Sequence, residues 1–149
     1  MTDYPTSLLP DRGRCTGRGA CASGCPKGAI HMLPDREGFL YPTVTDACIQ
    51  CGHCAHICPV LKQREPRPEP AVFAAWNRDD AIRKDSTSGG VFTALADYIL
   101  ESGGVVFGAA FDGKQHLRHI ACFRKEDLWR LRGAKYVQSD LGETFRTVK

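Results

Sequence analysis

The sequence predicts an α+β protein of two small units, and three features of its 149 residues support this prediction. Two cysteine-rich segments with related spacing lie within residues 1–61. A run of charges and prolines, KQREPRPEP, then interrupts the chain at 62–70. From residue 71 on, helix-like and strand-like apolar patterns alternate. Because prolines neither continue a helix nor pair inside a sheet, residues 62–70 are predicted to link a unit at 1–61 to a unit at 71–149.

The first unit contains an unbroken C-x2-C-x2-C-x3-C-P run that ends at Cys58-Pro59. This spacing is typical of a bacterial ferredoxin-type iron-sulfur cluster, in which three thiolates on one short loop bind three irons and the fourth serves a second cluster. Structural zinc sites more often use two ligand pairs with a longer spacer, so zinc is the weaker interpretation. Residues 1–14 lack the segments of an export signal, and two-residue spacings make poor disulfides. The sequence therefore predicts reduced thiols in a cytoplasmic iron-sulfur protein.

A second copy of the run begins at Cys15, which aligns with Cys48, and Arg18 stands where the complete run has Cys51. If the last cysteine of each run serves the other run's cluster, as in two-cluster ferredoxins, one site has four thiols and the other has three. The four-thiol site, predicted to hold a [4Fe-4S] cluster, consists of Cys25, Cys48, Cys51 and Cys54. The three-thiol site consists of Cys15, Cys21 and Cys58. Since arginine has no lone pair for iron, the second site is left with a [3Fe-4S] cluster, no cluster, or a [4Fe-4S] cluster with an outside ligand.

The first unit is expected to have two similar halves, each with a cysteine loop and a short helical turn. Hairpin strands are predicted at Ala29–Leu33 and Gly38–Val44, around a turn at Asp35-Arg36. So small a unit has little apolar core, so its folding is expected to depend on cluster binding. Two histidines inside the complete run, His53 and His56, could hydrogen-bond cluster sulfur, but surface exposure is the favoured interpretation.

The second unit is predicted as an α/β domain associated with a flavin and truncated by the end of the chain. Its strand-like runs are Ala71–Trp76, Val105–Phe111 and His116–Phe123. Its helical patterns run from Val91 to Gly103-Gly104, over Glu126–Leu131, and from Leu141 on. Cys122 is expected to be a buried structural cysteine, and His116 and His119 should face opposite sides of a strand, which makes them poor joint metal ligands.

One loop of the second unit has the composition of a phosphate site. Ser86, Thr87, Ser88, Gly89 and Gly90 lead directly into the predicted helix. Hydroxyls and free backbone N–H groups at a helix N-terminus bind phosphate, so the loop could grip the pyrophosphate of a flavin. A plain helix cap with glycine-permitted geometry explains the same residues equally well.

Composition limits the classes of partner. Hydrophobic residues make up 42% of the chain and charged residues 25%, which is ordinary for a globular protein. No apolar stretch approaches the roughly 20 residues of a membrane span. Residues 1–61 carry five basic and five acidic side chains, so the net charge of +3 falls entirely on residues 62–149. This charge is too small to indicate nucleic acid binding, but it suits an anionic cofactor or substrate.

The order of these segments resembles the N-terminal part of the coenzyme F420 hydrogenase/dehydrogenase beta subunit family. The resemblance rests on the two cysteine runs, the proline-rich break, STSGG at 86–90, GGVVFGAAFD at 103–112 and LRGAKYVQSDLG at 131–142. It implies an iron-sulfur flavoprotein whose clusters pass electrons between FAD and a substrate, such as the deazaflavin coenzyme F420 or a chlorophyll derivative. The chain departs from the family at Arg18, at Ala134, where serine is more usual, and in ending at Lys149, before the region that completes the FAD site.

The sequence thus leads to two functional expectations. The first is iron-sulfur electron transfer in the N-terminal part of a flavin-dependent oxidoreductase, with a flavin domain or a redox protein as partner and a deazaflavin or another small molecule as substrate. The second is a non-enzymatic, ferredoxin-like carrier that docks a separate flavoprotein. A weaker third interpretation keeps the cysteine loops for structure only.

Overall fold

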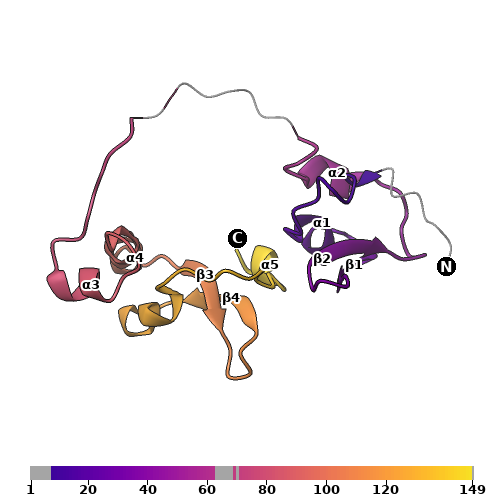
Figure 1. The fold of residues 1–149 in the computed structure, drawn as a ribbon. Coiled ribbons are helices and arrows are strands. Elements are labelled where there is room, and N and C mark those ends of the chain that lie inside the picture. Colours follow the sequence, from indigo (N-terminus) through magenta and orange to yellow (C-terminus); the bar gives the residue numbers. More distant parts are fainter. Residues whose placement is uncertain (1–7, 63–68, 70, 149) are drawn as a thin grey trace. The chain divides into compact units, whose positions relative to one another are not determined.

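The computed structural model describes residues 8–62, 69 and 71–148. The chain forms two compact units, one of Met1–Pro66 with Leu141–Lys149 and one of Arg67–Asp140. Figure 1 shows the elements along the chain. The predicted boundaries at 61 and 71 differ from this division, which groups the last residues with the first unit. Most of the predicted linker at 62–70 lies outside the described residues.

The first unit has a mixed helix and strand content built around one hairpin. Strands β1 (Ile30–Pro34) and β2 (Leu40–Val44) pair antiparallel, with Ile30 opposite Val44 and Pro34 opposite Leu40. Its helices are short: α1 (Ala20–Ser23), α2 (His53–Ile57) and α5 (Thr144–Thr147). The predicted hairpin is therefore present, with bounds close to those expected, and a short helix lies within each cysteine run as predicted.

Two contacts hold the first unit's segments together. A Cβ at Gly24 would lie 2.3 Å from Cδ1 of Ile57, so a larger residue there would require the end of the Ile57 side chain to move. At the other end of the first cysteine loop, Arg12 Nη2 pairs with Asp35 Oδ2 at 3.0 Å, and its guanidinium lies 4.4 Å from the ring centre of Tyr41. The segment before Cys15 is thereby tied to the hairpin.

The last described residues pack on α1. Nε of Arg146 donates to the backbone oxygen of Ser23 at 2.9 Å, and the Ser23 hydroxyl donates to the backbone oxygen of Gly142 at 3.5 Å. These contacts are the reason that Leu141–Lys149 belongs to the first unit and not to the second.

The second unit consists of helices α3 (Asp80–Lys84) and α4 (Val91–Glu101), strands β3 (Val106–Phe111) and β4 (Leu117–Cys122), and the 3-10 helix η2 (Lys125–Leu131). The strands pair antiparallel, from Val106 opposite Cys122 to Phe111 opposite Leu117. A parallel bridge joins Asp140 to Arg118 along β4. The predicted helix, hairpin and short helix after the hairpin are therefore present.

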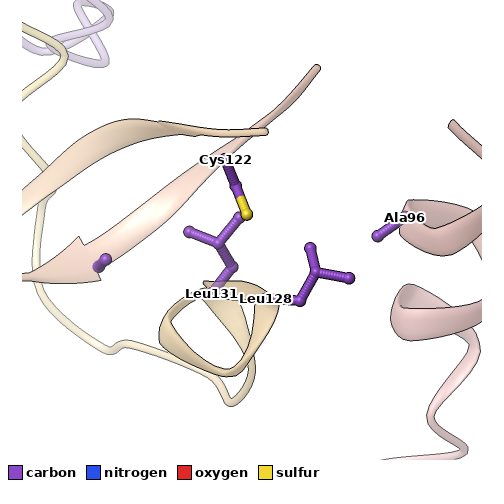
Figure 2. Packing of buried hydrophobic residues seen from close by; sticks show 5 residues of the cluster. Ala96, Cys122, Leu128 and Leu131 are labelled. Carbon is purple, nitrogen blue, oxygen red and sulfur yellow. The ribbon is translucent and has the colours of Figure 1, made fainter. Parts of the chain in front are cut away.

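The core of the second unit lies between α4, the hairpin and η2. Figure 2 shows Leu128 and Leu131 projecting from η2 toward Ala96 and Cys122. Leu128 is 1% exposed and Cys122 is 2% exposed, so the prediction of a buried cysteine at 122 is confirmed. The Cys122 thiol donates to the backbone oxygen of Arg124 at 3.2 Å.

Two sequence patterns in the second unit lead to a different structure from the one expected. Ala71–Trp76 forms no strand, because no strand of the described residues pairs with it. Its side chains Val72 and Phe73 are 91% and 84% exposed. Helix α4 exists as predicted, but most of the apolar residues that indicate it in the sequence are exposed, namely Phe92, Leu95, Tyr98 and Ile99, and Val91 is half-buried. Its buried residues are Thr93 and Ala96, because small side chains allow close approach to the core. No helix of the described residues is both long and apolar enough to cross a membrane.

Candidate iron-sulfur centres and a candidate anion site

One cavity of the first unit is lined by all four cysteines of the predicted four-thiol site. Cys25 comes from the first cysteine loop, and Cys48, Cys51 and Cys54 come from the second. Apolar residues complete the lining, among them Leu8, Ile30 and Ile49. Four thiols around an apolar cavity are the donor set of a [4Fe-4S] cluster, so these residues fit such a group.

Backbone N–H groups point at two of these sulfurs. The amide of Ala29 donates to Sγ of Cys25 at 3.3 Å, and the amide of Gln50 donates to Sγ of Cys48 at 3.4 Å. Such bonds favour the thiolate and are one means by which a protein sets the potential of a cluster. Burial raises the pKa of the Cys54 thiol, so binding of metal there must displace a proton.

A second cavity is lined by the three cysteines of the predicted three-thiol site. Cys15 and Cys21 come from the first loop, Cys58 comes from the second, and Arg18 also lines the cavity. Burial raises the pKa of the Cys21 thiol to about 11, with the neighbouring Cys15 adding to the effect. Each cavity therefore takes thiols from both cysteine runs, which is the exchange that the sequence predicts.

The histidines lie apart from these sites. His53 and His56 are exposed on α2. In the second unit, Nδ1 of His116 lies 3.6 Å from Oδ2 of Asp112, whereas Nδ1 of His119 lies 2.9 Å from the Ser139 hydroxyl. No three His, Cys, Asp or Glu side chains of the described residues converge on a single metal ion. Ligands of a multi-iron cluster need no such convergence, because each binds a different iron.

The STSGG loop of the second unit lines a cavity of about 410 Å³. Ser86 to Phe92 form one wall, and Leu131 to Ala134 form another. Gly90, with φ of 73°, is the N-cap of α4 and offers no side chain to its free amides. Thr87 and Ser88 are exposed, whereas the Ser86 hydroxyl already donates to the backbone oxygen of Ile82 at 2.7 Å. Ser86 thus holds the loop, and the hydroxyls of Thr87 and Ser88 face solvent.

Residues 75–77, which precede α3, hold the STSGG loop in place. The amide of Asn77 donates to the Gly89 oxygen at 2.7 Å, and Nδ2 of Asn77 donates to the Gly90 oxygen at 3.3 Å. A Cβ at Gly89 would lie 2.7 Å from the backbone oxygen of Ala75, so a larger residue cannot be accommodated without movement. The loop is therefore held in one position before any ligand arrives.

Arg132 supplies a positive charge to the same cavity, and sequence reasoning missed it. Nε of Arg132 donates to the Thr93 hydroxyl at 3.1 Å, which orients the guanidinium beside α4. Lys135 donates to the backbone oxygen of Arg132 at 2.7 Å, and burial lowers the pKa of this lysine. Free amides at a helix start, hydroxyls and a guanidinium are groups that bind anions such as phosphate in proteins, so this cavity is a candidate anion site. In the sequence, Arg132 could have been found from the LRGAK segment at 131–135. The net charge of residues 62–149 does not distinguish it from the other basic residues.

Two family models match different parts of this chain. A family model for the 4Fe-4S dicluster domain matches residues 14–61, and one for the N-terminal part of the coenzyme F420 hydrogenase/dehydrogenase beta subunit matches residues 72–145. The chain belongs to this beta subunit family. It is thus a member of an F420-related oxidoreductase family with an iron-sulfur electron-transfer domain.

Three relatives match different lengths of this chain. The coenzyme F420-dependent sulfite reductase of Methanocaldococcus jannaschii is 29% identical over 152 residues, which are 95% of this chain and 22% of that protein. A ferredoxin of Alicyclobacillus acidocaldarius subsp. acidocaldarius is 41% identical over 59 residues, which are 37% of this chain and 70% of the ferredoxin. An uncharacterized ferredoxin of M. jannaschii is 36% identical over 52 residues, which are 35% of this chain and 68% of the ferredoxin. The chain thus spans about a fifth of the sulfite reductase and most of each ferredoxin.

Proposed function

We propose that this chain is the electron-transfer part of a flavin-dependent oxidoreductase. The observation that carries the proposal is the cavity lined by Cys25, Cys48, Cys51 and Cys54, whose thiols match the donor set of a [4Fe-4S] cluster. A cluster bound there would supply single-electron transfer. The apolar residues of the cavity would shield part of the cluster from water, although Cys51 is exposed. The amides of Ala29 and Gln50 would stabilise negative charge on the sulfurs of Cys25 and Cys48. We place a second iron-sulfur centre at Cys15, Cys21 and Cys58.

The second unit supports the flavin half of the proposal. The cavity at the start of α4 would bind the pyrophosphate of FAD through the free amides after Gly90, the hydroxyls of Thr87 and Ser88, and the guanidinium of Arg132. A flavin exchanges electrons singly or in pairs, so it suits a partner of one-electron centres. Because one relative is named as dependent on coenzyme F420, a deazaflavin is the first substrate class to test.

A second candidate is a ferredoxin-like carrier that docks a separate flavoprotein. This alternative is motivated by the two ferredoxin relatives, 41% and 36% identical over 37% and 35% of this chain. The two candidates differ in the second unit: the carrier binds iron but no flavin.

The test is a measurement of iron, acid-labile sulfide and FAD on anaerobically purified protein. Cys25→Ser should lose the [4Fe-4S] signal, because this thiol lines the four-thiol cavity. Cys122→Ser is the matched control, since this buried cysteine lies in the core of the other unit and should keep the iron content of the wild type. Equal iron in both variants would contradict the ligand set, and bound iron without any affinity for FAD would favour the carrier.

A further inference from the structure

The cysteine loop that carries Arg18 keeps the backbone conformation of the complete loop. Gly17 has φ of 62° and Gln50 has φ of 53°, although a left-handed conformation is unfavourable for glutamine. Two positions further on, Gly19 has φ of 68° and Gly52 has φ of 72°. The members of each pair occupy equivalent positions in the sequence repeat that aligns Cys15 with Cys48. Turns of this type direct successive amides toward one side and occur around anions and iron-sulfur clusters.

Backbone hydrogen bonds follow the same repeat. The amide of the first cysteine in each run donates three residues back, to Arg12 at 3.2 Å in one run and to Thr45 at 3.1 Å in the other, and the Cys15 amide also donates to Asp11 at 2.9 Å. The last cysteine of each run also donates three residues back, at 3.3 Å in both runs. Helices α1 and α2 start at Ala20 and His53, which are again equivalent positions of the repeat. The substitution at position 18 has therefore changed a ligand and left the loop that presents the ligands intact.

The remaining residues of the three-thiol cavity are suited to a cluster. Cys58 is 9% exposed, and Met32 and Val60 supply apolar walls. Arg18 itself is exposed where it lines this cavity. No salt bridge within residues 8–62, 69 and 71–148 involves Arg18, so its charge faces the site without an acidic partner there. A guanidinium has no lone pair for iron, and its charge repels an incoming ferrous ion.

We propose that Cys15, Cys21 and Cys58 hold a [3Fe-4S] cluster, and that Arg18 occupies the corner where a fourth iron would need its ligand. The inference rests on the proposed function, because both sites belong to one iron-sulfur unit. It makes the two centres unequal: one has a complete set of thiols, and the other has three thiols beside a permanent positive charge. Arg18 is thus a residue that sets the cluster type at this site.

The repeat provides a matched pair of variants to test the inference. Arg18→Cys completes the first run, whereas Cys51→Arg gives the second run the same defect. Anaerobically reconstituted wild-type protein should hold about seven irons per chain, Arg18→Cys about eight, and Cys51→Arg about six. Mössbauer and EPR spectra should show one three-iron cluster in the wild type, none in Arg18→Cys and two in Cys51→Arg.

Other results would overturn the inference in recognisable ways. About four irons in the wild type, all in one four-iron cluster, would mean that the second site is empty while the proposed function stands. About eight irons in the wild type would mean that another ligand replaces the missing thiol. Iron in neither site would contradict both the inference and the proposed function. If Cys51→Arg does not fold, the wild type and Arg18→Cys decide the question by themselves.

Discussion

The substitution Gly89→Ala tests whether the STSGG loop is held in place by close backbone contact. A Cβ at this position would lie 2.7 Å from the backbone oxygen of Ala75 and 3.3 Å from Cα of Trp76. Neither atom belongs to a side chain that can rotate away, so the loop itself must move. Overpacking of this kind costs about 1–3 kcal/mol. Displacement of the loop also weakens the 2.7 Å bond from the Asn77 amide, which adds about 0.5–1.5 kcal/mol.

The expected loss of stability is therefore about 1.5–4.5 kcal/mol for the second unit. Both tryptophans, Trp76 and Trp129, lie in this unit, so urea unfolding followed by tryptophan fluorescence reports on it alone. If the loop binds FAD as proposed, its displacement should also weaken FAD binding, and a loss of about 1.4 kcal/mol of binding free energy would appear as a tenfold lower affinity in an FAD titration.

Gly113→Ala is the matched control in the same unit, since a Cβ there would meet nothing within 4 Å. This exposed turn position should change in stability by less than about 0.5 kcal/mol and leave FAD affinity unchanged. If Gly89→Ala and Gly113→Ala had the same unfolding midpoint and the same affinity for FAD, the loop would not be fixed by these contacts.

Three further predictions concern the core, a turn and the complete cysteine loop. Leu128→Ala should destabilise the second unit by about 2–5 kcal/mol in urea, because Leu128 is 1% exposed and packs between α4 and the hairpin. The amides of His116 and Lys114 hold the pKa of Asp112 below its usual value, so this carboxylate stabilises the turn at neutral pH and the contribution disappears as the pH falls through the folded-state pKa. Asp112→Asn should therefore flatten the stability profile below about pH 4. Gln50→Gly should slow the loss of iron in denaturant, because it removes a left-handed glutamine that costs about 1–2 kcal/mol.

Each of these predictions has a result that contradicts it. Leu131→Met, which keeps volume in the same core, should cost less than about 1.5 kcal/mol, and an equal effect of both leucine variants would argue against a cavity as the cause. If the stability of Asp112→Asn fell with decreasing pH in the same way as that of the wild type, this carboxylate would not stabilise the turn. Faster iron loss from Gln50→Gly would show that the glutamine side chain, and not the backbone conformation, matters there.

The sequence is most informative where spacing along the chain determines geometry. The cysteine spacing, together with the exchange of ligands in two-cluster ferredoxins, predicts two sets of thiols, and each set lines one cavity. Asp35-Arg36 and Asp112-Gly113 likewise mark both hairpin turns, since each aspartate binds amides within its own turn. In both cases the interaction is local, and the signal lies within a few residues.

Features that depend on distant segments cannot be predicted in this way. The apolar run at Ala71–Trp76 looks like a strand, but a strand also needs a neighbour, and composition does not reveal one. Apolar spacing identifies α4, yet it does not show that Thr93 and Ala96 face the core. Arg132 enters the anion cavity from the end of 3-10 helix η2, which lies far from the STSGG loop in sequence. The α3 helix at Asp80–Lys84 is too short to produce a periodic pattern.

The exchange of thiols between the two cysteine runs also constrains how the protein can be assembled. The cavity of the second run needs Cys25 from the first, and the cavity of the first run needs Cys58 from the second. If each cavity binds a cluster as proposed, neither run can supply a full set of ligands until the other has been synthesised. A chain interrupted between the runs would leave three thiols at one proposed site and two at the other, so neither site would keep its full set of ligands.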